Sequence, residues 1–133
     1  MRADLHPDLD PEERRRLVRL GVDLFNRGAF FEAHEAWEEV WRSTRPEPRD
    51  LFQGLIQVAA ALHMFRDLHR DRGPRVTLAK ARQRLEPFAP AAGGLDLADL
   101  LAAVRRWQEW LEDREGERPE WPSLRVLDWE AVA

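Results

Sequence analysis

Apolar residues recur at helical spacing in five stretches of the chain, and residues that favour turns separate these stretches. The pattern predicts helices over about residues 11–27, 30–42, 51–68 and 75–88, and a last one that follows Asp96. Gly28 and the pair Gly73-Pro74 break the pattern, and residues 87–94 form a linker rich in proline, alanine and glycine. We therefore expect an all-α fold with almost no sheet.

Two of the expected helices begin with residues that suit a helix N-terminus. Asp10 offers a capping side chain before Pro11, which is tolerated in the first turn because no amide bond is lost there. Asp96, with Asp99 three residues later, is placed to cap the fifth helix. The apolar face expected for the fifth helix comprises Leu97, Leu100, Leu101, Val104, Trp107 and Leu111.

The stretch 51–68 is apolar almost all the way round its expected helix, and such a helix is normally covered on every side. The sequence thus predicts a compact multihelical bundle of about five helices around a buried central helix. This central helix carries Gln53 and Gln57 one turn apart. In the fourth helix, the positions expected to face inward are Val76, Ala79 and Leu85.

The C-terminal part of the chain is expected to form an extended tail. From residue 115 onward, Pro119 and Pro122 forbid a regular helix. The tail still carries large apolar residues, which predict that it packs back on the helices: Trp121, Leu124, Val126, Leu127 and Trp129.

The helix over residues 30–42 places a histidine among apolar side chains. At about 100° per residue, His34 lies in the same arc as three aromatic residues, namely Phe30, Trp37 and Trp41. Glu38 follows four residues later, so both side chains project to the same side of the helix. This is the spacing at which a helix offers two ligands to one metal, or a carboxylate to orient an imidazole.

Polar side chains in an apolar environment need hydrogen-bond partners. The economical solution is that the second and third helices face each other, so that His34, Glu38, Gln53 and Gln57 form one buried network. Three roles stay open for it: a structural network that fixes helix register, a site for a divalent metal ion, or catalysis without a metal. The run His-Glu-Ala-Trp-Glu is not a zinc-protease motif, because Glu38 stands where the second histidine is required.

The other histidines are weaker candidates. We interpret His63 as a core histidine rather than a ligand, and His69 and His6 as solvated. The six tryptophans are interpreted as core and tail packing rather than a base-stacking platform.

A length of 133 residues suits one domain, taken here as residues 1–133. The chain has no cysteine, so any metal must be held by nitrogen and oxygen ligands. With a net charge of −4, the chain as a whole does not attract polyanions such as nucleic acid. We interpret the basic run 14–16 as a solvated helix face, so no nucleic-acid partner is expected. Without a signal or membrane segment, we expect a cytoplasmic protein. A homo-oligomer formed through the tail tryptophans remains open.

The motif His34-x-x-x-Glu38-x-x-Trp41, together with the flanking segments 25–28, 31–33 and 52–57, resembles the prokaryotic domain of unknown function family 309. The resemblance covers about residues 15–90 and does not extend to the fifth helix and tail, residues 95–133. It implies a multihelical bundle around a buried central helix. It also implies that the histidine and glutamate of the motif, here His34 and Glu38, bind a metal, with Trp41 closing the motif.

The first helical hairpin is also similar to a tetratricopeptide repeat. Leu17, Leu20, Gly21 and Leu24, then Ala33, Trp37 and Pro46, occupy that repeat's small and large positions. A second copy would need small residues near positions 55 and 67, where Leu55 and Asp67 stand. A solenoid needs about three repeats, so we interpret the likeness as shared helix-hairpin packing. A protein-interaction adaptor is kept as the alternative function.

Overall fold

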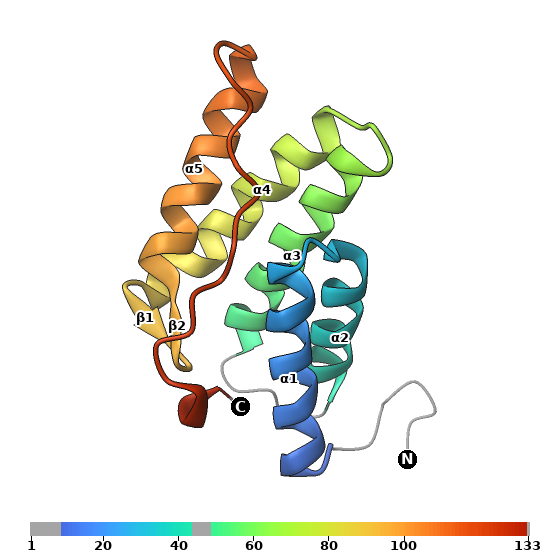
Figure 1. Cartoon of the computed structure of the whole chain (residues 1–133), viewed down its shortest axis with the longest axis vertical. Coiled ribbons are helices and arrows are strands. Elements are labelled where there is room, and N and C mark those ends of the chain that lie inside the picture. Colours follow the sequence, from blue (N-terminus) through green and yellow to red (C-terminus); the bar gives the residue numbers. More distant parts are fainter. Residues whose placement is uncertain (1–8, 44–48, 133) are drawn as a thin grey trace.

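The computed structural model describes residues 9–43 and 49–132. Among them lie five α-helices, as predicted (Figure 1): α1 Pro11–Asn26, α2 Phe30–Arg42, α3 Arg49–Arg66, α4 Arg72–Leu85 and α5 Leu97–Asp113. Two short 3₁₀ turns, Glu86–Phe88 and Trp129–Ala131, and two strands of two residues each, β1 Ala91–Ala92 and β2 Leu95–Asp96, complete the described structure. His6 and Pro46 lie outside the described residues.

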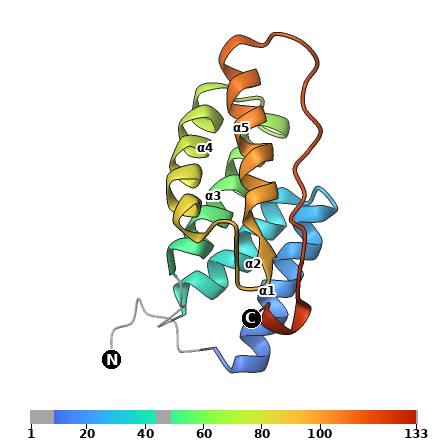
Figure 2. The same ribbon diagram turned by 90° about the vertical axis from the view of Figure 1, so that its left-hand side faces the viewer.

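Helix α3 is the centre of the bundle, which confirms the prediction for this stretch. It packs against α2 on one side and α4 on the other, while α1 packs on α2 and α5 on α4 (Figures 1 and 2). No residue of α3 from Leu51 to Arg66 is fully exposed. The helix ends two residues before Leu68, which is exposed. No helix among the described residues is both long and apolar enough to cross a membrane.

The hairpin of α1 and α2 depends on a close approach between Gly21 and Trp37. The Trp37 side chain is fully buried, and its Nε1 donates a hydrogen bond of 3.2 Å to the Val18 carbonyl. A Cβ atom at position 21 would lie 2.2 Å from that nitrogen, so only glycine fits here. Gly28, with φ of 82°, makes the turn between the helices in a conformation that other residues rarely adopt.

Helix α4 differs from its prediction in where it begins and which side it buries. It starts at Arg72, with Pro74 in its first turn, where the missing amide has no intrahelical partner to lose. Val76 is 45% exposed and Ala79 is exposed as well, so two of the three predicted inward positions are wrong. The buried face is instead formed by Pro74, Leu78, Ala81 and Leu85.

Of the two predicted N-cap residues, only Asp96 makes a capping hydrogen bond. Oδ1 of Asp96 accepts a hydrogen bond of 3.0 Å from the Asp99 amide, which caps α5 as expected. Asp10 stands at the N-cap of α1, yet its side chain makes no capping hydrogen bond. The residue type therefore marks the helix start in both cases, but it supplies the cap only at Asp96.

The tail after α5 folds back along that helix and reaches α1 (Figures 1 and 2), as predicted. Trp121 stacks on Trp107 with ring centroids 4.8 Å apart, and Leu124 is almost fully buried. The Asn26 side chain pairs with both backbone groups of Leu124, accepting from its amide at 2.6 Å and donating to its carbonyl at 2.9 Å. Two of the apolar tail residues expected to pack, Leu127 and Trp129, are exposed instead.

Candidate functional site

His34 and Glu38 lie side by side on α2, as their spacing predicts. His34 Nε2 is 3.0 Å from Glu38 Oε2. The two side chains are 23% and 29% exposed, so the pair is half-buried at the surface and not enclosed in the core as expected. Position 34 is at the edge of the apolar arc, whose centre is taken by the fully buried Ala33 and Trp37.

The second ring nitrogen of His34 faces a backbone carbonyl. Nδ1 lies 2.9 Å from the Phe31 oxygen, one helical turn earlier. A carbonyl only accepts hydrogen bonds, so Nδ1 must carry the proton for this bond to form. In the neutral ring, Nε2 is then the unprotonated nitrogen, and it faces the carboxylate of Glu38. A ring protonated at both nitrogens would instead donate to both oxygens.

Glu38 is shared between His34 and a cation. Its Oε2 faces the imidazole, while its Oε1 accepts a hydrogen bond from Nη2 of Arg42, one turn further along α2. An imidazole, a carboxylate and a guanidinium therefore follow one another along one face of α2. Each is four residues from the next, the spacing at which helical side chains meet.

The glutamines do not join this row in the described structure. Gln57 lines a hollow of about 510 Å³ together with residues of α4, among them Lys80 and Gln83. Its Oε1 is buried without a hydrogen-bond partner among the described residues. Gln53 is half-buried, and no hydrogen bond links it to His34 or Glu38. The expected four-residue network is therefore not supported, because α3 is covered on both sides and Gln57 lies on the α4 side.

Trp41, the last residue of the motif, is half-buried and packs against the core. The guanidinium of Arg49, in the first turn of α3, lies 4.2 Å from the centre of its ring. The contact joins the end of α2 to the start of α3. Trp41 thus has a packing role here, and no polar contact connects it with His34.

A second pair of the same kind, which sequence reasoning missed, lies on α3. His63 Nδ1 is 2.8 Å from Oδ2 of Asp67, again four residues later. Arg66 binds both carboxylate oxygens of Asp67. Hydrogen bonds from Arg66 and then His63 hold the pKa of Asp67 far below its ordinary value. The signal that could have found this pair is the shared spacing, histidine followed by an acid at the fourth residue.

Phe31 lies between the two histidines. Its ring centre is 5.3 Å from that of His34 and 5.0 Å from that of His63. The Phe31 side chain is 40% exposed, so this face of α2 and α3 presents an aromatic ring flanked by two imidazoles. The two pairs do not merge into one site: among the described residues, no three histidine, aspartate or glutamate side chains are grouped to hold a metal ion.

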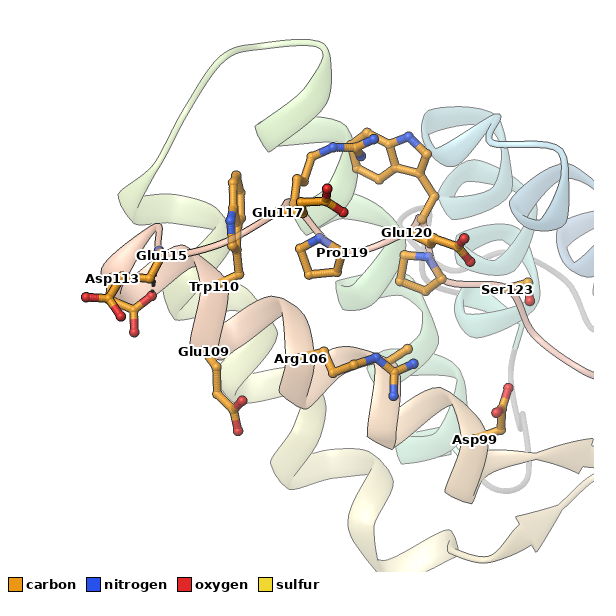
Figure 3. Close-up of a pocket in the computed structure, with 14 residues that line it drawn as sticks. Asp99, Arg106, Glu109, Trp110, Asp113, Glu115, Glu117, Pro119, Glu120 and Ser123 are labelled. Carbon is orange, nitrogen blue, oxygen red and sulfur yellow. Dashed lines mark hydrogen bonds between the residues drawn. The ribbon is translucent and has the colours of Figure 1, made fainter.

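A larger hollow lies away from both pairs, between α5 and the tail (Figure 3). Its volume is about 760 Å³. Many acidic residues line it, but in Figure 3 Glu109, Asp113 and Asp99 point in different directions from α5 and its start. The hollow therefore offers no converging set of carboxylates, and it lacks a histidine.

Comparison with known proteins finds similarity over part of the chain. An uncharacterized protein of Aquifex aeolicus (strain VF5) is 36% identical over 61 residues, which are 45% of this chain and 18% of that protein. The chain thus spans less than a fifth of the curated relative it matches. Residues 18–75, which include both histidine pairs, match the family described as Domain of unknown function (DUF309). Over residues 18–75 the chain is therefore similar to the family that the motif around His34 predicted.

Proposed function

We propose that the chain binds a divalent transition-metal ion through Nε2 of His34 and the carboxylate of Glu38. The observation that carries this proposal is the contact between His34 Nδ1 and the Phe31 carbonyl at 2.9 Å. Histidines that bind metals commonly donate the other ring N–H to a carbonyl or carboxylate, which fixes the tautomer and the ring orientation. The remaining lone pair, on Nε2, faces an anionic oxygen at 3.0 Å.

The donor chemistry, one imidazole nitrogen and one carboxylate, suits borderline ions such as zinc and nickel. Zinc binds imidazole nitrogen at about 2.0–2.1 Å and carboxylate oxygen at about 2.0–2.2 Å. Two ligands separated by about 3 Å need to open only slightly to admit such an ion. His34 and Glu38 fill two positions, and water or a bound molecule completes the coordination shell. A site of this kind holds its ion less tightly than a complete structural site and leaves positions open for exchange.

Two groups compete with the metal for this pair. Arg42 holds the other oxygen of Glu38, and a proton on Nε2 would occupy the metal's place. Metal affinity must therefore fall as the pH is lowered, because the ligand nitrogen has to be unprotonated. Replacing Arg42 by glutamine frees the carboxylate and should strengthen metal binding.

The test is calorimetric titration of zinc into chelator-treated protein that carries no histidine tag. His34→Ala and Glu38→Gln should each weaken binding by about tenfold or more, the loss of roughly 1.4 kcal/mol or more. His69→Ala and Glu35→Gln serve as matched controls, because both residues are exposed and lie outside the pair. Absence of saturable zinc binding in the parent protein, or equal loss in the controls, would refute the proposal.

A peptide-binding adaptor is the second candidate, and one observation favours it. The helices hold an extended segment, the chain's own tail, by bonding its backbone through Asn26 and enclosing Trp121 among aromatic rings. An adaptor would hold a foreign peptide in the same way. A variant that ends at Arg118 should then bind a peptide of residues 119–133, and replacing Asn26 by alanine should abolish that binding.

A further inference from the structure

A small cationic hollow lies where the ends of α3 and α5 meet the tail. Its volume is about 330 Å³, at the small end of the range for ligand pockets. It is lined by Phe65, Arg66, His69, Arg70, Asp71, Arg114 and Trp121. Three arginines against one aspartate give its lining an excess of positive charge, in a chain whose net charge is negative.

Two of the three arginines have structural partners. Arg66 binds both oxygens of Asp67 and also the Gly28 carbonyl, while Arg114 binds Asp71. Both arginines also stand at helix C-termini, where a cation offsets the helix dipole. Each guanidinium has five N–H donors, and these contacts engage three of them in Arg66 and one in Arg114. Donors therefore remain on both groups.

Arg70 differs from the other two. Its backbone amide donates to the Met64 carbonyl at 3.0 Å, which fixes its position in the turn after α3. Its side chain makes no ion pair or hydrogen bond with any residue in the described parts of the chain. Arg70 is exposed, so its guanidinium is solvated by water and is free to meet an anion that enters the hollow.

The aromatic walls strengthen any charge interaction in the hollow and do not themselves offer a stacking surface. The Phe65 ring packs edge-on against Trp107 and Trp110, and Arg114 lies 5.2 Å from its centre. Trp121 is stacked on Trp107, and the guanidinium of Arg118 lies 4.2 Å from the centre of the Trp121 ring. These rings form one side of the hollow, and next to such an apolar surface an arginine–anion contact is stronger than in bulk water.

From these contacts we infer that the hollow binds the phosphate group of a small phosphorylated molecule. Arginine forks match the oxygens of phosphate geometrically. Arg66 and Arg114 are each paired with an aspartate, so the positive charge of Arg70 is the one left for a bound anion to balance. The size of the hollow suits a single phosphate with a small attached group. This inference does not depend on metal binding, since neither His34 nor Glu38 lines the hollow.

The test is calorimetric titration of the full chain with glucose 6-phosphate, inorganic phosphate and glucose at constant ionic strength. Both phosphates should bind at one site and glucose should not. Arg70→Ala should weaken phosphate binding by about tenfold, the usual loss for one charge-assisted hydrogen bond. Arg105→Ala is the matched control, because this exposed arginine on α5 does not line the hollow.

Failure of both phosphates to bind, or an equal loss in Arg70→Ala and Arg105→Ala, would overturn the inference. Binding of glucose 6-phosphate but not of inorganic phosphate would also overturn it, because the sugar would then be the recognised group. A thermal midpoint measured for each variant without ligand confirms that it is folded, so a loss of binding can be assigned to the missing guanidinium.

Discussion

Nε2 of His34 lies 3.0 Å from Oε2 of Glu38, while Nδ1 of the same ring lies 2.9 Å from the Phe31 carbonyl. The backbone of α2 therefore sets which nitrogen can meet the carboxylate. This coupling of a helix carbonyl, an imidazole and an acid within two turns needs no contribution from another helix. The contact with the carbonyl fixes the orientation of the half-buried His34 ring at the protein surface.

The contact between Gly21 and Trp37 should dominate the stability of the first hairpin. Gly21→Ala places a Cβ atom 2.2 Å from Trp37 Nε1 and should lower the free energy of unfolding by about 1–3 kcal/mol or more. Gly73→Ala is the control, since its nearest neighbour would be the flexible Met64 sulfur at 3.3 Å. Urea denaturation compares the two variants, and similar midpoints would contradict the packing described for α1 and α2.

The two N-cap aspartates should differ in their contribution to stability. Asp96→Ala removes the hydrogen bond to the Asp99 amide and should cost about 1 kcal/mol. Asp10→Ala should cost clearly less, because the Asp10 side chain makes no capping bond. Thermal unfolding of both variants measures the difference. Equal losses would mean that Asp10 caps α1 in solution as well.

The double hydrogen bond of Asn26 should hold the tail in place. Asn26→Ala leaves the amide and carbonyl of Leu124 without this partner and should cost roughly 1–3 kcal/mol. Asn26→Asp keeps an acceptor for the amide and should retain protection of that proton. Hydrogen exchange at the Leu124 amide tests this directly. Unchanged exchange in Asn26→Ala would show that other contacts hold the tail.

Asp67 should contribute to the pH dependence of stability. Its pKa is lower in the folded protein than its ordinary value of about 3.9, so its contribution is present above that pH and is lost as the pH falls toward the folded pKa. Asp67→Asn should therefore show a smaller loss of stability below about pH 4 than the parent. Asp50→Asn is the control, because Asp50 forms a more exposed ion pair with Arg84. Parallel pH profiles for the parent and Asp67→Asn would contradict this role.

The elements that could be predicted from the sequence are those that local rules decide. Periodicity fixed the five helices to within a few residues, and the two prolines correctly predicted an extended tail. Val76 was placed wrongly because it is apolar, whereas the buried stripe of α4 follows the spacing of Leu78, Ala81 and Leu85. Val76 is two residues from Leu78, about 200° around the helix.

The arrangement of the site depended on contacts that periodicity does not reveal. Because α3 is apolar on nearly every side, its pattern could not show whether Gln57 faces α2 or α4. The pairing of His34 with Glu38 was predictable, since both lie on one helix four residues apart. The same rule applied to His63 and Asp67 would have found the second pair, but its approach to Phe31 is set by the packing of α2 against α3.

The most direct test of the proposed metal site is nitrogen-15 NMR of the His34 ring while zinc is added at neutral pH. Nδ1 should carry the proton before zinc is added, and the Nε2 resonance should then shift strongly while Nδ1 stays protonated. His34→Gln identifies the signals, and Glu38→Gln should reduce the shift at equal zinc. A His34 Nε2 resonance that zinc leaves unmoved, with the ring otherwise intact, would contradict the proposal that this pair binds metal.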